Sequence, residues 1–197
     1  MTPVYKLSAN SVKNGRTVYG SMLAGNTAFV ATDFQSIATV SVGSGGAANV
    51  EFTSIPATYT HLQVRIISRN SANDNQSISM QFNSDTGNNY ARHRLYGLGS
   101  SVGADGSSST NLIIAGVEPT ATSTFGASIV DILDYANTNK YKTARVLSGR
   151  ETNSVGSVFF NSGLWQSTNA ITSIKLAPES STFAQYSHFA LYGIKSA

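Results

Sequence analysis

The chain has 197 residues, a length that suits one ordinary domain with an appended segment. It contains no cysteine, which excludes disulfides, thiolate metal sites and cysteine nucleophiles. Only 12% of the residues are charged and the net charge is +3, whereas Ser, Thr, Asn and Gln together account for 70 residues. Because 41% of the residues are hydrophobic, we exclude intrinsic disorder and expect a folded protein coated with hydroxyl and amide groups.

The N-terminal segment, residues 1–33, has neither the period of a helix nor that of a strand. Its apolar residues are scattered among Ser, Asn, Gly and Thr, and no acidic residue precedes Asp33. We predict an extended arm that becomes ordered on a partner surface, with the alternative that it lies back over its own domain. The expected partner-anchoring residues of this arm are Tyr5, Leu7, Val12, Val18, Tyr19, Met22, Leu23 and Phe29.

Residues 34–197 are predicted to form one β domain. Short runs rich in Val, Ile, Phe and Tyr are separated by clusters of Gly, Asn, Asp and Ser, as strands are separated by turns. Within 62–66 and 78–82, apolar and polar residues alternate with a period of two, which places one face on a core. The fold class is therefore predicted as all-β, an antiparallel two-sheet β-sandwich of jelly-roll type. The expected strands are 35–42, 49–55, 61–69, 77–83, 90–98, 111–117, 129–135, 141–149, 155–164, 171–176 and 186–194.

Three loops have a composition typical of turns. Residues 43–46 and 85–89 each join two expected strands, and Asp105-Gly106 suits a turn within a loop at 100–110. The oxygens of the 85–89 loop could bind calcium, but this loop lacks the dense alternating acids of a strong site. We therefore predict a plain hairpin turn there.

No arrangement of residues predicts catalysis. A Gly-x-Ser-x-Gly motif is absent, and His61, His93 and His188 lie in three separate expected strands without the spacing of metal ligands. Asp131 and Asp134 form the closest carboxylate pair with apolar neighbours, but residues three apart in a strand face opposite sides. We expect Asp131 to face solvent and Asp134 to cap the next turn. The prediction is no enzyme, no cofactor and no metal, with a glycan depolymerase as the least favoured alternative.

Two classes of partner are excluded by charge and hydropathy. The excess positive charge comes from Lys6, Lys13 and Arg16, which are too few and too dispersed for a nucleic-acid interface. No apolar run approaches the ~18 residues that a membrane span needs, and the basic-then-apolar order of a signal peptide is absent. We predict neither nucleic acid nor membrane as a partner.

Aromatic residues provide the remaining candidate contacts. Tyr90, Arg92, Arg94 and Tyr96 alternate along one expected strand and are predicted to form an exposed basic-aromatic strip suited to a subunit contact. Trp165 is the only tryptophan, and we favour a core position for it. The alternative is a sugar-stacking platform, with the loops at 85–89 and 100–110 completing a glycan site.

Four runs of sequence resemble a group of tailed-bacteriophage virion proteins. They are FQSIATVSVGSGG at 34–46, FTSIPATYTHLQ at 52–63, DILDYANTNKYK at 131–142 and FALYGI at 189–194, and they span the whole expected sandwich. The resemblance implies a structural component of the virion, which is assembled in the cytoplasm of the host bacterium. The resemblance also implies a homotrimer, the assembly expected of decoration and fibre-tip proteins with this fold.

Among virion components, we favour a capsid cement or decoration protein. Its arm would bind the major capsid protein or other virion proteins, and its sandwich would form a knob on the head surface that stabilises the shell against the pressure of packaged DNA. The alternative is the receptor-binding domain of a tail fibre or spike that recognises a bacterial surface glycan.

Overall fold

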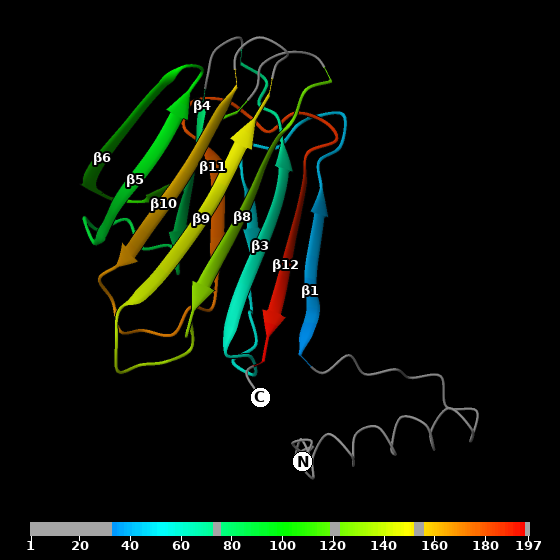
Figure 1. Ribbon diagram of the computed structural model, residues 1–197. Coiled ribbons are helices and arrows are strands. Elements are labelled where there is room, and N and C mark those ends of the chain that lie inside the picture. The colour runs from blue at the N-terminus through cyan, green and yellow to red at the C-terminus, as the bar shows by residue number, and fades with distance from the viewer. Residues whose placement is uncertain (1–32, 73–75, 119–122, 152–155, 196–197) are drawn as a thin grey trace, which may run out of the picture. The chain divides into compact units, whose positions relative to one another are not determined.

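The structure, a computed structural model, describes residues 33–72, 76–118, 123–151 and 156–195 (Figure 1). The predicted arm and its eight anchoring residues lie outside this part of the chain, with the exception of Asp33. The described residues contain twelve strands and no helix. The strands are β1 (Phe34–Ser41), β2 (Val50–Phe52), β3 (His61–Ser68), β4 (Gln76–Phe82), β5 (Tyr90–Leu98), β6 (Ser101–Ser109), β7 (Leu112–Glu118), β8 (Gly126–Leu133), β9 (Lys142–Arg150), β10 (Ser157–Trp165), β11 (Ile174–Pro178) and β12 (His188–Ile194).

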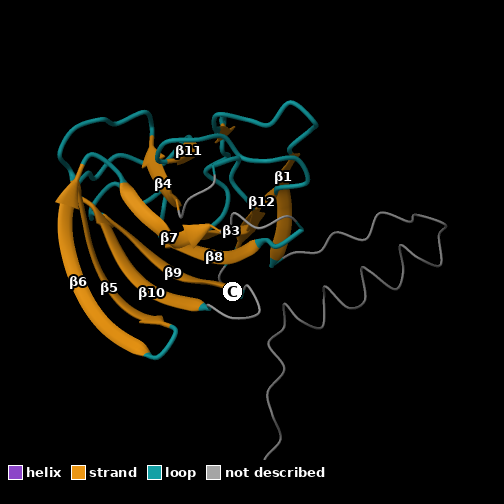
Figure 2. Cartoon of the chain, turned by 90° about the horizontal axis from the view of Figure 1, so that it is seen from above, coloured by secondary structure: helices purple, strands orange, loops and turns teal. Residues whose placement is uncertain are grey.

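The strands form two antiparallel sheets. The large sheet has eight strands in the order β1-β12-β3-β8-β9-β10-β5-β6, and the small sheet has the order β2-β11-β4-β7. Figure 2 shows the large sheet curving around the small one, so that one of its faces covers the small sheet and the other faces outward. The predicted all-β fold with two antiparallel sheets is confirmed, whereas the jelly-roll type of its connections stays a prediction.

The core lies between the two sheets and follows from the period of two. In β3, for example, Leu62, Val64 and Ile66 are buried, whereas the alternate residues Arg65 and Ile67 are exposed. The small sheet contributes Met80 and Leu176, neither of which is exposed at all. Burying each such side chain contributes roughly 1.5–3 kcal/mol, so the inward-facing residues account for the pairing of the sheets.

All eleven expected strands are present, but the expectation of a loop at 100–110 is wrong. Residues Ser101–Ser109 form β6, which pairs with β5 along its whole length. The sequence of β6, SVGADGSSS, lacks the alternating large apolar residues of a strand with one buried face. It forms a strand because it lies at the edge of the large sheet and pairs with the backbone of β5. There, the ion pairs of Asp105 with Arg92 and Arg94 take the place of apolar burial.

The turn at 85–89 joins β4 to β5, as predicted, and its chemistry is centred on one carboxylate. Asp85 accepts hydrogen bonds from the backbone of Gly87 at 2.8 Å, from Asn89 Nδ2 at 3.0 Å and from Trp165 Nε1 at 2.7 Å. These hydrogen bonds, above all the one from Trp165, lower the pKa of Asp85 below its ordinary value of 3.8. The carboxylate therefore ties the hairpin to the core.

Asp85→Asn should weaken the fold near neutral pH by about 1 kcal/mol, because hydrogen bonds to a charged acceptor are stronger than those to a neutral one. A lowered pKa in the folded state means that this stabilisation is present above the ordinary value of 3.8 and is lost as the pH falls below it. The variant should thus lose less stability on acidification than the wild type. Urea titrations across this pH range measure the difference, with the exposed Glu51→Gln as the control at neutral pH. Equal acid sensitivity of Asp85→Asn and wild type would contradict the assignment.

Candidate functional site

The outward face of the large sheet carries a continuous band of exposed apolar side chains. The band crosses six neighbouring strands, β3-β8-β9-β10-β5-β6, and is called the outer band below. Its members are Ile67, Ala127, Ile129, Leu147, Val158, Phe160, Leu95 and Val102.

Strand register aligns these residues into two adjacent rows. Residues paired in register on neighbouring strands point to the same face of a sheet, and so do residues two apart within one strand. Each set of register partners on the outward face is therefore a row across the sheet. The first row runs through Ile67, Ala127, Gly149, Val158, Gly97 and Val102. The second row runs through Arg65, Ile129, Leu147, Phe160, Leu95 and Ala104. The outer band is thus a consequence of sheet register and not a scatter of single residues.

The side chains of the outer band are exposed to a degree unusual for their size. Val102 is 89% exposed, Leu95 61% and Leu147 54%. Singly exposed hydrophobic residues are common on protein surfaces, but contiguous ones mark sites of interaction. With strands ~4.8 Å apart, a band across six strands extends for about 24 Å.

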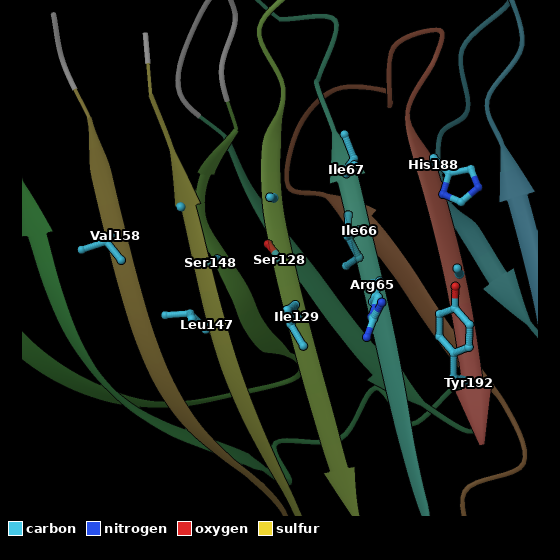
Figure 3. A pocket seen from close by; sticks show the side chains of 13 residues that line it. Arg65, Ile66, Ile67, Ser128, Ile129, Leu147, Ser148, Val158, His188 and Tyr192 are labelled. Atoms are coloured by element: carbon cyan, nitrogen blue, oxygen red, sulfur yellow. The ribbon is translucent and has the colours of Figure 1, made fainter. Parts of the chain in front are cut away.

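The outer band is hollowed into two shallow grooves. One groove of about 560 Å³ is lined by Ile67, Ile129, Leu147 and Val158, which Figure 3 shows on four different strands of the sheet. The other, of about 460 Å³, is lined by Phe160 and Leu95 of the band, by Ala104 beside them and by the polar His93 and Ser162. The first groove also includes Gly149, whose missing side chain leaves space among the larger residues. Such a surface can receive protruding side chains of a partner.

A polar row borders the outer band on one side. It runs through Gln63, Asp131, Arg145, Ser162 and His93. Gln63 Nε2 donates a hydrogen bond of 2.8 Å to Asp131 Oδ1. Arg145 is exposed and takes part in no ion pair within the described part of the chain. An apolar centre with a polar border is the usual anatomy of a protein–protein interface.

Sequence reasoning missed the outer band, although a signal for it exists. Neighbouring central strands contain the pairs Ile66-Ile67, Ile129-Val130, Val146-Leu147 and Phe159-Phe160. Two consecutive apolar residues in a strand point to opposite faces, so such pairs on adjacent strands make both faces of a sheet apolar. One member of each pair accounts for the core, and the other forms the outer band.

The predicted basic-aromatic strip on β5 does share one face, but its expected exposure is wrong. Tyr90 is 1% exposed and belongs to the core. Arg94 Nη2 lies 2.7 Å from Asp105 Oδ2, and Arg92 Nη1 lies 3.0 Å from Asp105 Oδ1. The Arg94 guanidinium also lies over the Tyr96 ring, 5.1 Å from its centroid. The strip faces inward because β6, the strand that the sequence did not reveal, brings a carboxylate to the two arginines.

The charges of Arg92, Arg94 and Asp105 stabilise one another within the fold. The hydrogen bond from Arg94 holds the pKa of Asp105 below its usual value, and burial lowers the pKa of Arg92. Both guanidinium groups are occupied by intramolecular contacts, and the exposed positions of β5 are His93 and Leu95 on the outward face and Leu98 at the end of the strand. The strip therefore leaves the outer band as the accessible surface of this strand.

Trp165 is a core residue, as favoured, and the stacking-platform alternative is wrong. Its side chain is 2% exposed, and its ring packs against Phe82 and Tyr90 at centroid distances of 5.5 and 6.4 Å. The indole nitrogen is occupied by Asp85. A ring enclosed in this way offers no face to a sugar.

Two of the other candidate polar residues, His61 and Asp134, lie in contact with each other. Asp134 follows β8 directly with a positive φ of 49°, pairs with Lys140 and contacts His61 Nδ1 at 3.5 Å. Asp131 lies on the outward face beside Gln63. In the described ranges, no group of three or more His, Asp or Glu residues could hold a metal ion.

No known protein family, curated protein or solved structure matches the chain. Within the described part of the chain, no helix is long and apolar enough to cross a membrane.

Proposed function

We propose that the protein is a non-enzymatic structural component of a tailed-bacteriophage virion, a capsid cement or decoration protein. The observation that carries this proposal is the outer band, an exposed apolar surface with a polar border on a rigid β body. Such a surface favours assembly with other protein subunits. Its exposed apolar side chains contribute to stability only when a partner removes them from water. The resemblance of 34–46, 52–63, 131–142 and 189–194 to phage virion proteins supplies the setting.

The proposed mechanism divides the chain into two parts. The body is a sandwich of jelly-roll type that forms a homotrimeric knob on the head surface, and residues 1–33 form an arm along neighbouring subunits of the major capsid protein. Each Å² of apolar arm surface buried across a subunit seam contributes ~25 cal/mol, less the cost of ordering the arm. The sum offsets the outward pressure of packaged DNA.

The composition of the body suits a particle outside the cell. Without cysteine, the chain cannot be damaged by thiol oxidation, which no cellular enzyme would repair there. The charged groups of the body are few and several are held in pairs, such as Arg94 with Asp105 and Lys140 with Asp134. Both properties support long persistence in an extracellular structure.

The alternative function, a receptor-binding domain of a tail fibre or spike, retains one supporting feature. Phe34 and Tyr192 stack with their centroids 4.8 Å apart, and Arg65 lies over both rings. Phe34 is 39% exposed, so this stack could contact a sugar ring in place of Trp165.

Binding to separated phage parts tests the proposal. The purified full-length chain should sediment with phage heads that lack it, in a saturable manner, and should not sediment with host cells. The reason is that the arm would recognise the major capsid protein and not a cell-surface glycan. Binding to host cells or to their polysaccharide, lost on Phe34→Ala but not on the exposed Thr53→Ala, would instead establish the receptor-binding alternative.

A further inference from the structure

We propose that the outer band is the surface through which copies of this chain meet, so that in the assembled oligomer each copy covers the outer band of its neighbours. The inference deepens the proposed function and rests on it, since the homotrimer is part of that proposal. What it adds is the face, the residues and the arrangement of the contact.

The geometry of the rows favours an axis of rotation parallel to the strands. Such an axis keeps every row at its own level, so the apolar rows of one copy meet the apolar rows of the next. The polar row then meets itself as well. At that level Asp131 and Arg145 are neighbours in register on β8 and β9, so each copy presents one acid and one base to the next.

Charge distinguishes a second copy from the other available occupant, the N-terminal segment. Residues 1–32 contain three basic residues and no acidic one. The outer band is bordered by Arg65 and Arg145 against Asp131 alone, so a basic segment would meet an excess of like charge. A second copy meets a surface with both signs, so its exposed Arg145, which takes part in no ion pair within the described part of the single chain, can pair with Asp131 of the neighbour.

The size of the surface also suits a stable contact between folded bodies. The two apolar rows, the polar row and a fourth row beyond it, formed by Leu133, Thr143, Leu164, Ala91 and Ser108, share the outward face. At ~4.8 Å between strands and ~6.8 Å between alternate residues, four rows project to roughly 650 Å². A standard interface buries about 800 Å² of accessible surface on each partner. Leu147 on β9 and Phe160 on β10 lie on the two central strands of the six, are 54% and 47% exposed, and can enter the grooves of a neighbour.

The mass of the full chain in solution, measured by sedimentation equilibrium, is the primary test. The wild type should have three times the 20.8 kDa mass of one chain. Leu147→Glu places a charge at the centre of the outer band and should weaken association by at least about 100-fold. Thr53→Glu adds the same charge at an exposed position just after β2 and should leave the mass unchanged. Val102→Lys, at a side chain 89% exposed, provides a second disruption that cannot disturb the core of the single chain.

Cysteine cross-linking locates the contact. Because the chain has no cysteine, Leu147→Cys carries a single thiol, which a short bismaleimide should join to the same thiol of a neighbour. Thr53→Cys should give no such product. A monomeric wild type, or an oligomer that survives both Leu147→Glu and Val102→Lys, would overturn the inference. An oligomer that dissociates in these variants but never binds phage heads would uphold the face and refute the proposed function.

Discussion

Trp165→Ala should lower the free energy of unfolding by about 3–5 kcal/mol, a large part of the stability of a domain of this size. Trp165 is among the largest fully buried side chains, and its removal leaves a cavity between Phe82 on β4 and Tyr90 on β5. It also leaves Asp85 without the donor that joins the β4–β5 hairpin to β10. Both losses act at the point where the large sheet and the small sheet are held together.

Chemical denaturation followed by far-ultraviolet circular dichroism measures the effect, because the variant lacks tryptophan fluorescence. Trp165→Phe is the matched control: it retains an aromatic ring in the core and loses the hydrogen bond to Asp85, and it should cost about 1–3 kcal/mol. A loss below about 1 kcal/mol for Trp165→Ala would mean that this site carries little of the core energy.

Deletion of residues 2–32 should abolish binding to phage heads and leave the body folded. All twelve strands lie between Phe34 and Ile194, and the buried hydrophobic cluster of the described residues begins at Val42. The body therefore has its own core, whereas the proposed attachment energy resides in the deleted segment. We expect a loss of affinity of at least about 100-fold with a thermal midpoint within a few degrees of the wild type.

A full-length control separates anchoring from chain length. Replacing Tyr5, Leu7, Tyr19 and Phe29 with serine keeps the segment and its positive charges but removes four of its large apolar side chains. This variant should bind heads as poorly as the deletion does. Full occupancy of heads by the truncated body would refute the role of residues 1–33 as an attachment arm.

The strands with one buried face were predictable because their period of two is a direct record of burial. β3 and β4 bury every second side chain, and their expected ranges differ from the observed ones by at most one residue at each end. β5 was placed without error, yet the face that its arginines occupy was not. Periodicity shows that Arg92 and Arg94 share a face, but only the partner strand decides whether that face meets solvent or a carboxylate.

The outer band and β6 were harder to predict for related reasons. A sequence shows which residues are apolar, but Ile129 on the outer band and Val130 in the core look alike until the register of six strands is known. β6 has almost no apolar alternation, and its strand conformation depends on pairing with β5. Both features arise from contacts between distant segments, which no local pattern contains.

Electron microscopy of intact virions, with a gold-tagged antibody bound to this protein, tests the central claim most directly. The account predicts label distributed over the surface of the head, at many sites per particle. Label confined to the tail or its tip would place the protein among the receptor-binding appendages. Virions without any label would contradict the assignment to the particle altogether.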